Sequence, residues 1–107
     1  GDTGPQGPSG TIIRAYDITL ATSSWKSTTD TAAKNAGWAY QCDASVSGCT
    51  AALEPSATVS LESVVVAQKA GLGSICNTGA GFCRFYAEKV PSAAISLRLL
   101  LMERVQT

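Results

Sequence analysis

The four cysteines are the residues of this 107-residue chain whose type and spacing could do chemistry. They form two pairs, Cys42 with Cys49 and Cys76 with Cys83, and the spacing within the two pairs is identical. Zinc sites usually place paired ligands about two to four residues apart and often use histidine, which this chain lacks. Two disulfides are therefore the leading interpretation, and no metal or cofactor is expected.

Four cysteines allow three disulfide connectivities, and the sequence favours the two local pairs. Each interval, "CDASVSGC" and "CNTGAGFC", contains turn-forming residues that let the chain fold back as a hairpin. Disulfides predict an oxidising, extracellular destination. The alternative is four reduced and packed thiols, as in a protein that assembles in a cytoplasm, and the sequence leaves it open.

Catalytic signatures are missing from the sequence. The chain has no histidine, which excludes Ser-His-Asp and Cys-His sites. A carboxylate pair could cleave a glycosidic bond, but Asp17, Asp43 and Glu88 alternate with apolar residues, as solvent-facing strand positions do. The glycine-rich "GLGSICNTGAG" lacks the lysine of a phosphate loop. The sequence therefore predicts a protein that is not an enzyme.

Two tryptophans, Trp25 and Trp38, are the candidates for a binding role, because an exposed tryptophan anchors sugars and proteins well. A lone tryptophan in a small β domain more often belongs to the core. The sequence therefore assigns no residue to receptor contact.

Charge and hydropathy narrow the partners. Eight basic residues balance eight acidic ones, and only 15% of the chain is charged, which argues against nucleic acid or an anionic membrane as partner. The apolar run "AAISLRLLLM" is too short for membrane insertion and contains Arg98. The hydrophobic fraction of 45% is high for one small domain, which favours apolar surface buried between subunits.

The chain opens "GDTGPQGPSG", with a glycine at every third position: Gly1, Gly4, Gly7 and Gly10. Only glycine fits at the crowded axis of a collagen triple helix. A flexible Gly/Pro-rich linker is the alternative. Three triplets are too few to hold three chains together. The sequence therefore predicts the end of a collagen-like stalk over 1–10, followed by one trimerising domain over 11–107.

Alternating apolar residues predict strands in the first half of this domain. The stretches "YDITL" and "WAYQCDASV" both alternate, which indicates one strand up to Leu20 and a second that begins at Trp38. Between them we expect a polar loop or one helical turn capped by Asp30. A turn at Pro55 is expected to lead into a short strand over 57–61.

The second half is expected to hold a helix and a hairpin. The spacing of Val64, Val65, Gln68 and Leu72 predicts a short helix that ends at Gly71 or Gly73, although the three valines of "SVVVA" also suit a strand. "SICNTGAGFCRFYAEKVP" predicts a hairpin whose glycines supply the positive φ of the turn.

The final strand is apolar on both faces. Ile95, Leu97, Leu99 and Leu101 share one face, whereas Leu100 and Met102 lie on the other. A strand that is apolar on both sides is covered on both sides, and in so small a domain another subunit supplies the second cover. The predicted trimer interface is accordingly Ile95, Leu97, Leu99, Leu100, Leu101 and Met102.

These patterns give the expected fold class. We predict a mainly β domain: a small antiparallel β-sandwich knob with at most one short helix, homotrimeric, behind the end of a collagen-like stalk.

The pattern resembles a known family over nearly the whole chain. A collagen-like segment leads into "YDITLATSSW", and "GFCRFYAEKVPSAAISLRLLL" later precedes the final strand, as in the C-terminal knob of collagen-like tail fibres of phages and prophages. The cysteines depart from that pattern. The resemblance implies a homotrimeric fibre tip with a structural role and a host-recognition role, located in the virion.

Two other classes follow collagen in known proteins. A bacterial collagen-like surface protein carries the same kind of C-terminal domain on a cell exterior, and this is the alternative function. A jelly-roll knob of complement or tumour-necrosis type needs about ten strands, more than the five to seven that the patterns predict.

Overall fold

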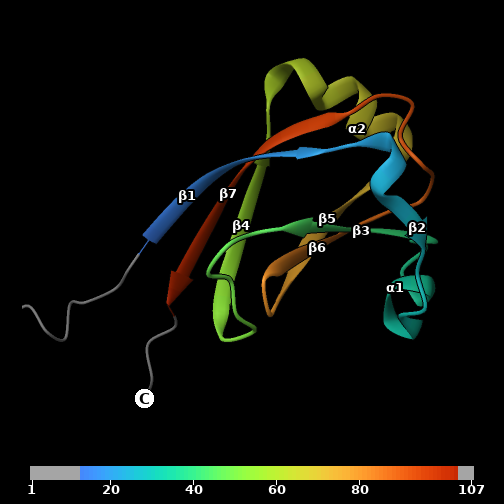
Figure 1. The fold of residues 1–107 in the computed structure, drawn as a ribbon. Helices are drawn as coiled ribbons and strands as arrows, with labels where there is room; N and C mark the ends of the chain where they lie inside the picture. Colours follow the sequence, from blue (N-terminus) through green and yellow to red (C-terminus); the bar gives the residue numbers. More distant parts are fainter. Residues whose placement is uncertain (1–12, 104–107) are drawn as a thin grey trace, which may run out of the picture.

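The computed structural model describes residues 13–103 of the chain, and these residues form two antiparallel β-sheets. Figure 1 shows the strands of the two sheets crossing one another, with the short helices at the periphery. The three-stranded sheet has the order β1-β7-β4, with bounds Ile13–Leu20, Ile95–Glu103 and Leu53–Val59. The four-stranded sheet has the order β2-β3-β6-β5, with bounds Trp25–Ser27, Tyr40–Ser45, Phe82–Ala87 and Leu72–Gly79. The predicted mainly β architecture is confirmed.

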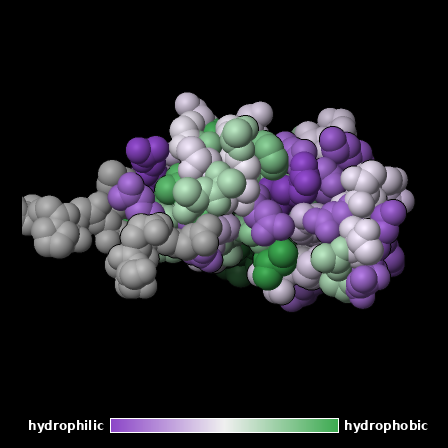
Figure 2. Space-filling model, turned by 90° about the horizontal axis from the view of Figure 1, so that it is seen from below, coloured by the Kyte–Doolittle hydropathy of each residue, from purple (hydrophilic) through white to green (hydrophobic). Residues whose placement is uncertain are grey.

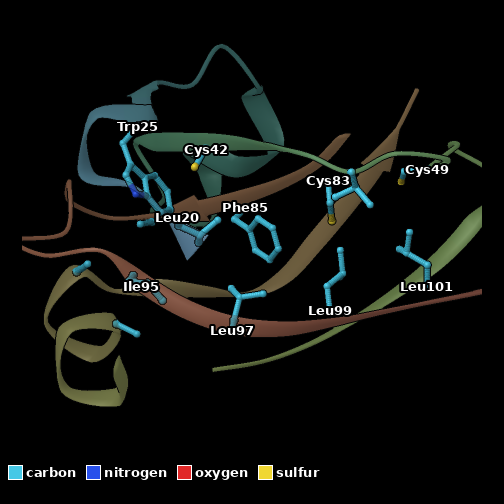
Figure 3. Close-up of a cluster of buried hydrophobic side chains, with 14 residues drawn as sticks. Leu20, Trp25, Cys42, Cys49, Cys83, Phe85, Ile95, Leu97, Leu99 and Leu101 are labelled. Carbon is cyan, nitrogen blue, oxygen red and sulfur yellow. The ribbon is translucent and has the colours of Figure 1, made fainter. Parts of the chain in front are cut away.

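The core lies between the two sheets, as the close-up in Figure 3 shows. Every second residue of β7 points into it, because side chains alternate between the faces of a strand. Leu97 is 2% exposed and Phe85, from the opposing sheet, is 3% exposed. The cluster of buried residues draws on both sheets and includes Leu20, Trp25, Cys42, Val46, Cys83, Phe85, Ile95, Leu97, Leu99 and Leu101.

The helix predicted after residue 63 is present as α2, Val64–Ala70. It ends at Gly71, whose φ of 67° is the left-handed conformation that favours glycine. The predicted face was wrong, because Val65 is 59% exposed whereas Ala67 and Ala70 are buried. Small alanine side chains let this short helix approach the core closely.

The polar segment after β2 contains one helical turn, α1 over Thr31–Asn35. The Asp30 side chain accepts hydrogen bonds from the amides of Ala32 and Ala33, so it is the N-cap that the sequence suggested. Two further 3-10 turns, η2 over Thr22–Ser24 and η3 over Leu61–Ser63, precede β2 and α2.

The predicted turn at Pro55 is wrong, since Pro55 lies inside β4, opposite Leu101. A proline is tolerated there because β4 is an edge strand of its sheet and needs no amide donor on its free side. The strand consequently begins earlier than predicted. It also ends earlier, and Leu61 lies in η3 with 88% of its side chain exposed.

The predicted hairpin is confirmed as β5 and β6, which meet at a turn containing Gly81 with φ 84°. The pairing between the two strands is irregular between Leu72 and Cys76. This irregularity affects the outer strand of the four-stranded sheet, because β5 is an edge of that sheet.

Candidate functional site

At one end of the three-stranded sheet the outer face is apolar over β1 and β7, and polar over β4, where Glu54 and Ser56 lie opposite Met102 and Leu100. Ile13 pairs with Met102 and Ala15 pairs with Leu100, so these four side chains project from the same face. Ile13 is 60% exposed, and Leu100 and Met102 are half-buried. We call Ile13, Ala15, Leu100 and Met102 the outer patch, and the end of the sheet where β1 begins at Ile13 the entry end.

Farther from the entry end the same face becomes polar. Arg98 lies opposite Asp17, and its Nε is 3.6 Å from a carboxylate oxygen, with both side chains largely exposed. Ser96 and Thr19 form the next pair. The apolar character is therefore restricted to the entry end.

The predicted trimer interface divides into two groups. Leu100 and Met102 belong to the outer patch, as an interface requires. The other four predicted residues cannot contact a partner, because each is at most 2% exposed between the chain's own sheets: Ile95, Leu97, Leu99 and Leu101. The period of the strand predicted the two faces correctly, but the sequence did not show which face the domain's own second sheet covers.

All four cysteines carry free thiols in this structure. The predicted pair Cys42–Cys49 is wrong for this fold. Cys42 lies in β3, and roughly 13 Å of extended chain separates it from Val46. Cys49 lies beside Val46, because its amide donates a hydrogen bond to the Val46 carbonyl at 3.1 Å. Figure 3 shows the two side chains well apart along the core, with Cys83 between them. A disulfide needs Cα atoms within about 7 Å.

Cys76 and Cys83 do lie together, on neighbouring strands of the hairpin. Cys76 pairs with Phe85, two residues beyond Cys83, so the two sulfurs lie on one face. A hydrogen bond from Cys83 lowers the pKa of the Cys76 thiol, and the same bond together with burial raises the pKa of Cys83. The two cysteines are diagonal neighbours across the strand pair, and a disulfide between them stays a prediction. Burial, aided by Asp43, raises the pKa of Cys42 to about 11.

The outer face of the four-stranded sheet carries a hydrogen-bonded polar network. Arg84 donates to the two carboxylate oxygens of Asp43 at 2.7 and 3.1 Å, and the Gln41 amide donates to the same carboxylate at 3.2 Å. The Thr28 hydroxyl donates to the buried Gln41 side-chain oxygen at 2.8 Å. The Arg84 guanidinium holds the pKa of Asp43 below its usual range and its own pKa is raised in return.

Residues around α1 cover the rest of this face. The Tyr86 ring, only 2% exposed, stacks on Trp38 with 5.8 Å between ring centroids. Its hydroxyl donates to Asp30 at 3.0 Å and accepts from the Asn77 amide at 3.3 Å. The bond from Tyr86 lowers the pKa of Asp30, while burial raises the pKa of Tyr86. Trp38 therefore packs over the outer face of the four-stranded sheet, opposite to the face that carries Cys42. The prediction that the second strand begins at Trp38 was wrong, because β3 begins at Tyr40.

The two tryptophans thus have different roles. Trp25 is 8% exposed and belongs to the core, as a lone tryptophan most often does. Trp38 is half-buried and occupies the space over Gly73, where an added Cβ would come within 2.9 Å of the indole ring. Figure 2 shows that the end of the molecule away from the grey residues is mostly hydrophilic.

A hollow with a volume of about 460 Å³ lies between the edge strands β4 and β5. We call it the edge cleft. Its walls include Pro55 and Ala57 of β4 and Leu72 of β5, and it reaches the core residues Phe85 and Leu97. The Thr78 hydroxyl, which donates to the Leu53 carbonyl at 2.9 Å, joins the two edges beyond one end of the cleft.

Metal ligands, membrane-spanning helices and the collagen-like glycines are three further features of the chain. Residues 13–103 contain no cluster of three or more histidine, cysteine or acidic side chains that could hold a metal ion. No helix in that range is long and apolar enough to cross a membrane. The collagen-like glycines Gly1, Gly4, Gly7 and Gly10 lie outside the described residues.

Comparison of the chain with protein-family models, with curated proteins and with solved structures found no match.

Sequence reasoning missed two features of these surfaces. The outward positions of the first strand, Ile13 and Ala15, could have been found, because they alternate with the inward-facing Tyr16 and Ile18. The edge cleft has no comparable signal, since its walls come from strands that are distant in sequence and belong to different sheets.

Proposed function

We propose that this domain is the trimeric tip of a collagen-like fibre: it brings three chains into register for the stalk and binds a host surface. The outer patch is the observation that carries the proposal. It is an apolar surface on a charge-poor domain, and it lies at the end of the sheet that is closest in sequence to the collagen-like triplets.

Chain length supports this placement. Three peptide steps separate Gly10 from Ile13, and an extended chain spans at most about 3.6 Å per residue. Ile13 of each chain therefore lies within about 11 Å of its own Gly10. A triple helix brings three Gly10 residues to one axis, so the three outer patches would lie close to that axis, within reach of the neighbouring chains. Completing their burial contributes on the order of 1 kcal/mol for each large side chain.

Host binding belongs to the other end of the domain. With the stalk at the entry end, the hydrophilic end that carries α1 points outward along the fibre (Figure 1, Figure 2). Loops positioned by a rigid scaffold are the usual place for recognition. This part of the proposal assigns no individual contact residue.

The assembly is tested by mass in native solution. The full chain of 11.0 kDa is expected to sediment as a trimer of three times that mass. Leu100→Asp is expected to be monomeric, because three carboxylates would be buried near the axis without partners. Thr19→Asp, on the same face but away from the entry end, is the matched control and should stay trimeric.

Circular dichroism shows whether Leu100→Asp is still folded. If the wild-type chain is monomeric at micromolar concentration, or if folded Leu100→Asp remains trimeric, the proposed assembly is wrong. Host binding is tested with the fluorescently labelled trimer on a panel of bacterial strains. Saturable binding to particular strains supports a tip, and equal binding to all strains or to none contradicts it.

A further inference from the structure

We propose that the edge cleft of one subunit receives the outer patch of the next subunit around the three-fold axis. This inference rests on the proposed trimer and adds the surface against which each patch packs. The occupant is a second copy of this chain, through Ile13, Leu100 and Met102.

Away from the axis itself, a three-fold arrangement pairs two different surfaces of each subunit. In a closed ring of three copies each interface is heterologous, so one patch on a subunit meets a different patch on its neighbour. The outer patch provides the first surface. The second must be apolar and must lie to one side of the first, so that the subunits close around an axis.

The edge cleft satisfies the requirement of position. It borders the outer patch across the single strand β4, whose Ser56 lies opposite Leu100 and whose Glu54 lies opposite Met102. Both Glu54 and Ser56 also line the cleft. Rotation about an axis moves a side chain around it but not along it. A patch and its acceptor must therefore lie at the same height along the three-fold axis. The pairing of β4 with β7 places the outer patch and the edge cleft at the same height along the strands.

The cleft also has the chemistry to accept apolar side chains. Its apolar lining includes Phe85, Leu97 and the rim residue Ile75, which is 48% exposed, and the polar side chains of Glu54, Ser56 and Ser74 lie beside them. A hollow of about 460 Å³ has the size of a small ligand site, which is ample for side chains such as those of Leu100 and Met102.

The strands that border the cleft are poorly suited to pairing with an added strand. Pro55 of β4 lacks an amide donor, and the pairing of β5 is irregular between Leu72 and Cys76. Side chains inserted from a neighbour fit this hollow better than an extra β-strand. The features that protect the edges thus leave the cleft open to the outer patch.

The first experiment changes the cleft and leaves the outer patch intact. Ile75→Asp in the full chain is expected to raise the concentration at which half of the trimer dissociates at least tenfold, measured by sedimentation. Val65→Asp is the matched control, because Val65 is 59% exposed on α2 and does not line the cleft. It should leave that concentration unchanged.

The second experiment locates the contact directly. Met102 is replaced by the photoreactive residue benzoylphenylalanine, and irradiated trimers are digested and sequenced by mass spectrometry. Crosslinks from residue 102 of one copy to residues 54–57 or 72–76 of another are expected. Crosslinks to residues 95–103 of another copy would show patch packed on patch and would overturn the inference.

The results separate this inference from the proposed function. If Leu100→Asp is monomeric while Ile75→Asp remains as trimeric as Val65→Asp, the trimer stands and the cleft is not its acceptor. If the wild-type chain is itself monomeric, both proposals are overturned together.

Discussion

The outer faces of the two sheets differ in how far the chain's own side chains cover them. The four-stranded sheet covers its own outer face: Tyr86 lies under Trp38, and Asp43 is bound by Arg84 and Gln41. Within residues 13–103, nothing covers Ile13, Leu100 and Met102 of the three-stranded sheet in this way. The chain's own side chains cover the outer face of the four-stranded sheet, whereas the outer patch of the three-stranded sheet is exposed among residues 13–103. Substitutions on the first should therefore act on folding, whereas substitutions on the second should act on assembly.

The largest expected effect is that of Tyr86→Ala. The change removes a buried ring, its stacking on Trp38 and its hydrogen bonds to Asp30 and Asn77, so the free energy of unfolding should fall by about 3–5 kcal/mol. Urea unfolding at a concentration too low for assembly measures it. Under the same conditions Met102→Ala, on the three-stranded sheet, should lower the free energy of unfolding by well under half as much. Equal losses for the two variants would contradict the comparison.

The next effect comes from oxidation, and it is confined to the four-stranded sheet. Glutathione disulfide should convert the neighbouring thiols of Cys76 and Cys83 into a disulfide and release two molecules of reduced glutathione. The bridge should raise the free energy of unfolding by about 2–3 kcal/mol in the chain-entropy model. Peptide mapping without reduction identifies the pair. A bridge between Cys42 and Cys49 would contradict the structure.

Gly73→Ala tests the cover over β5. An added Cβ would come within 2.9 Å of the Trp38 ring, so the indole must shift, at a cost of about 1–2 kcal/mol. The fluorescence of Trp38 should move to longer wavelength as the ring becomes more hydrated. Ser74→Ala, one residue along the same edge, serves as the control. An unchanged spectrum for Gly73→Ala would mean that the indole does not depend on this contact.

The smallest effect is the pH dependence of the Asp43–Arg84 pair. Because Arg84 lowers the pKa of Asp43 in the folded state, the stabilisation is fully present above the unfolded value, about 3.9. It is lost as the pH falls through the lowered folded pKa. The pair should contribute about 0.5–1 kcal/mol, since both side chains remain partly exposed.

In Asp43→Asn the free energy of unfolding should fall less on acidification than in the wild type, because the contribution of the Asp43–Arg84 pair is already lost. Urea unfolding between neutral pH and pH 2 measures the difference. Asp17→Asn is the control from the other sheet, where Arg98 and Asp17 are separated by 3.6 Å and largely exposed. It should have no measurable effect. A larger effect at Asp17 than at Asp43 would reverse the comparison between the sheets.

Local signals predicted most of the elements. The alternation up to Leu20, the hairpin at Gly81 and the final strand from Ile95 all depend on neighbours in sequence, and the structure has each of them. The single helical turn capped by Asp30 was one of two open alternatives. Pro55 was misread because the cost of a proline depends on whether its strand is an edge, which only the sheet order reveals.

The surfaces were less predictable, for a physical reason. The cover of the four-stranded sheet requires Trp38, Gly73 and Tyr86 to meet, and nothing local in the sequence indicates that contact. The Cys42–Cys49 interval looked like a closed hairpin, but β3 runs straight through its first half. Apart from Leu100 and Met102, the candidate interface could only be placed once the second sheet showed which face was already covered.

If this domain ends a stalk, as proposed, the pairing of β1 with β7 has a mechanical consequence. Tension transmitted through the chain at Ile13 pulls along the axis of β1, which is held to β7 in continuous register from Ile13–Met102 to Leu20–Ile95. Such a load acts on the hydrogen bonds of the whole ladder in shear, because they lie perpendicular to the strands. The bonds share the force instead of opening one after another, so this geometry suits an attachment that must bear a pull.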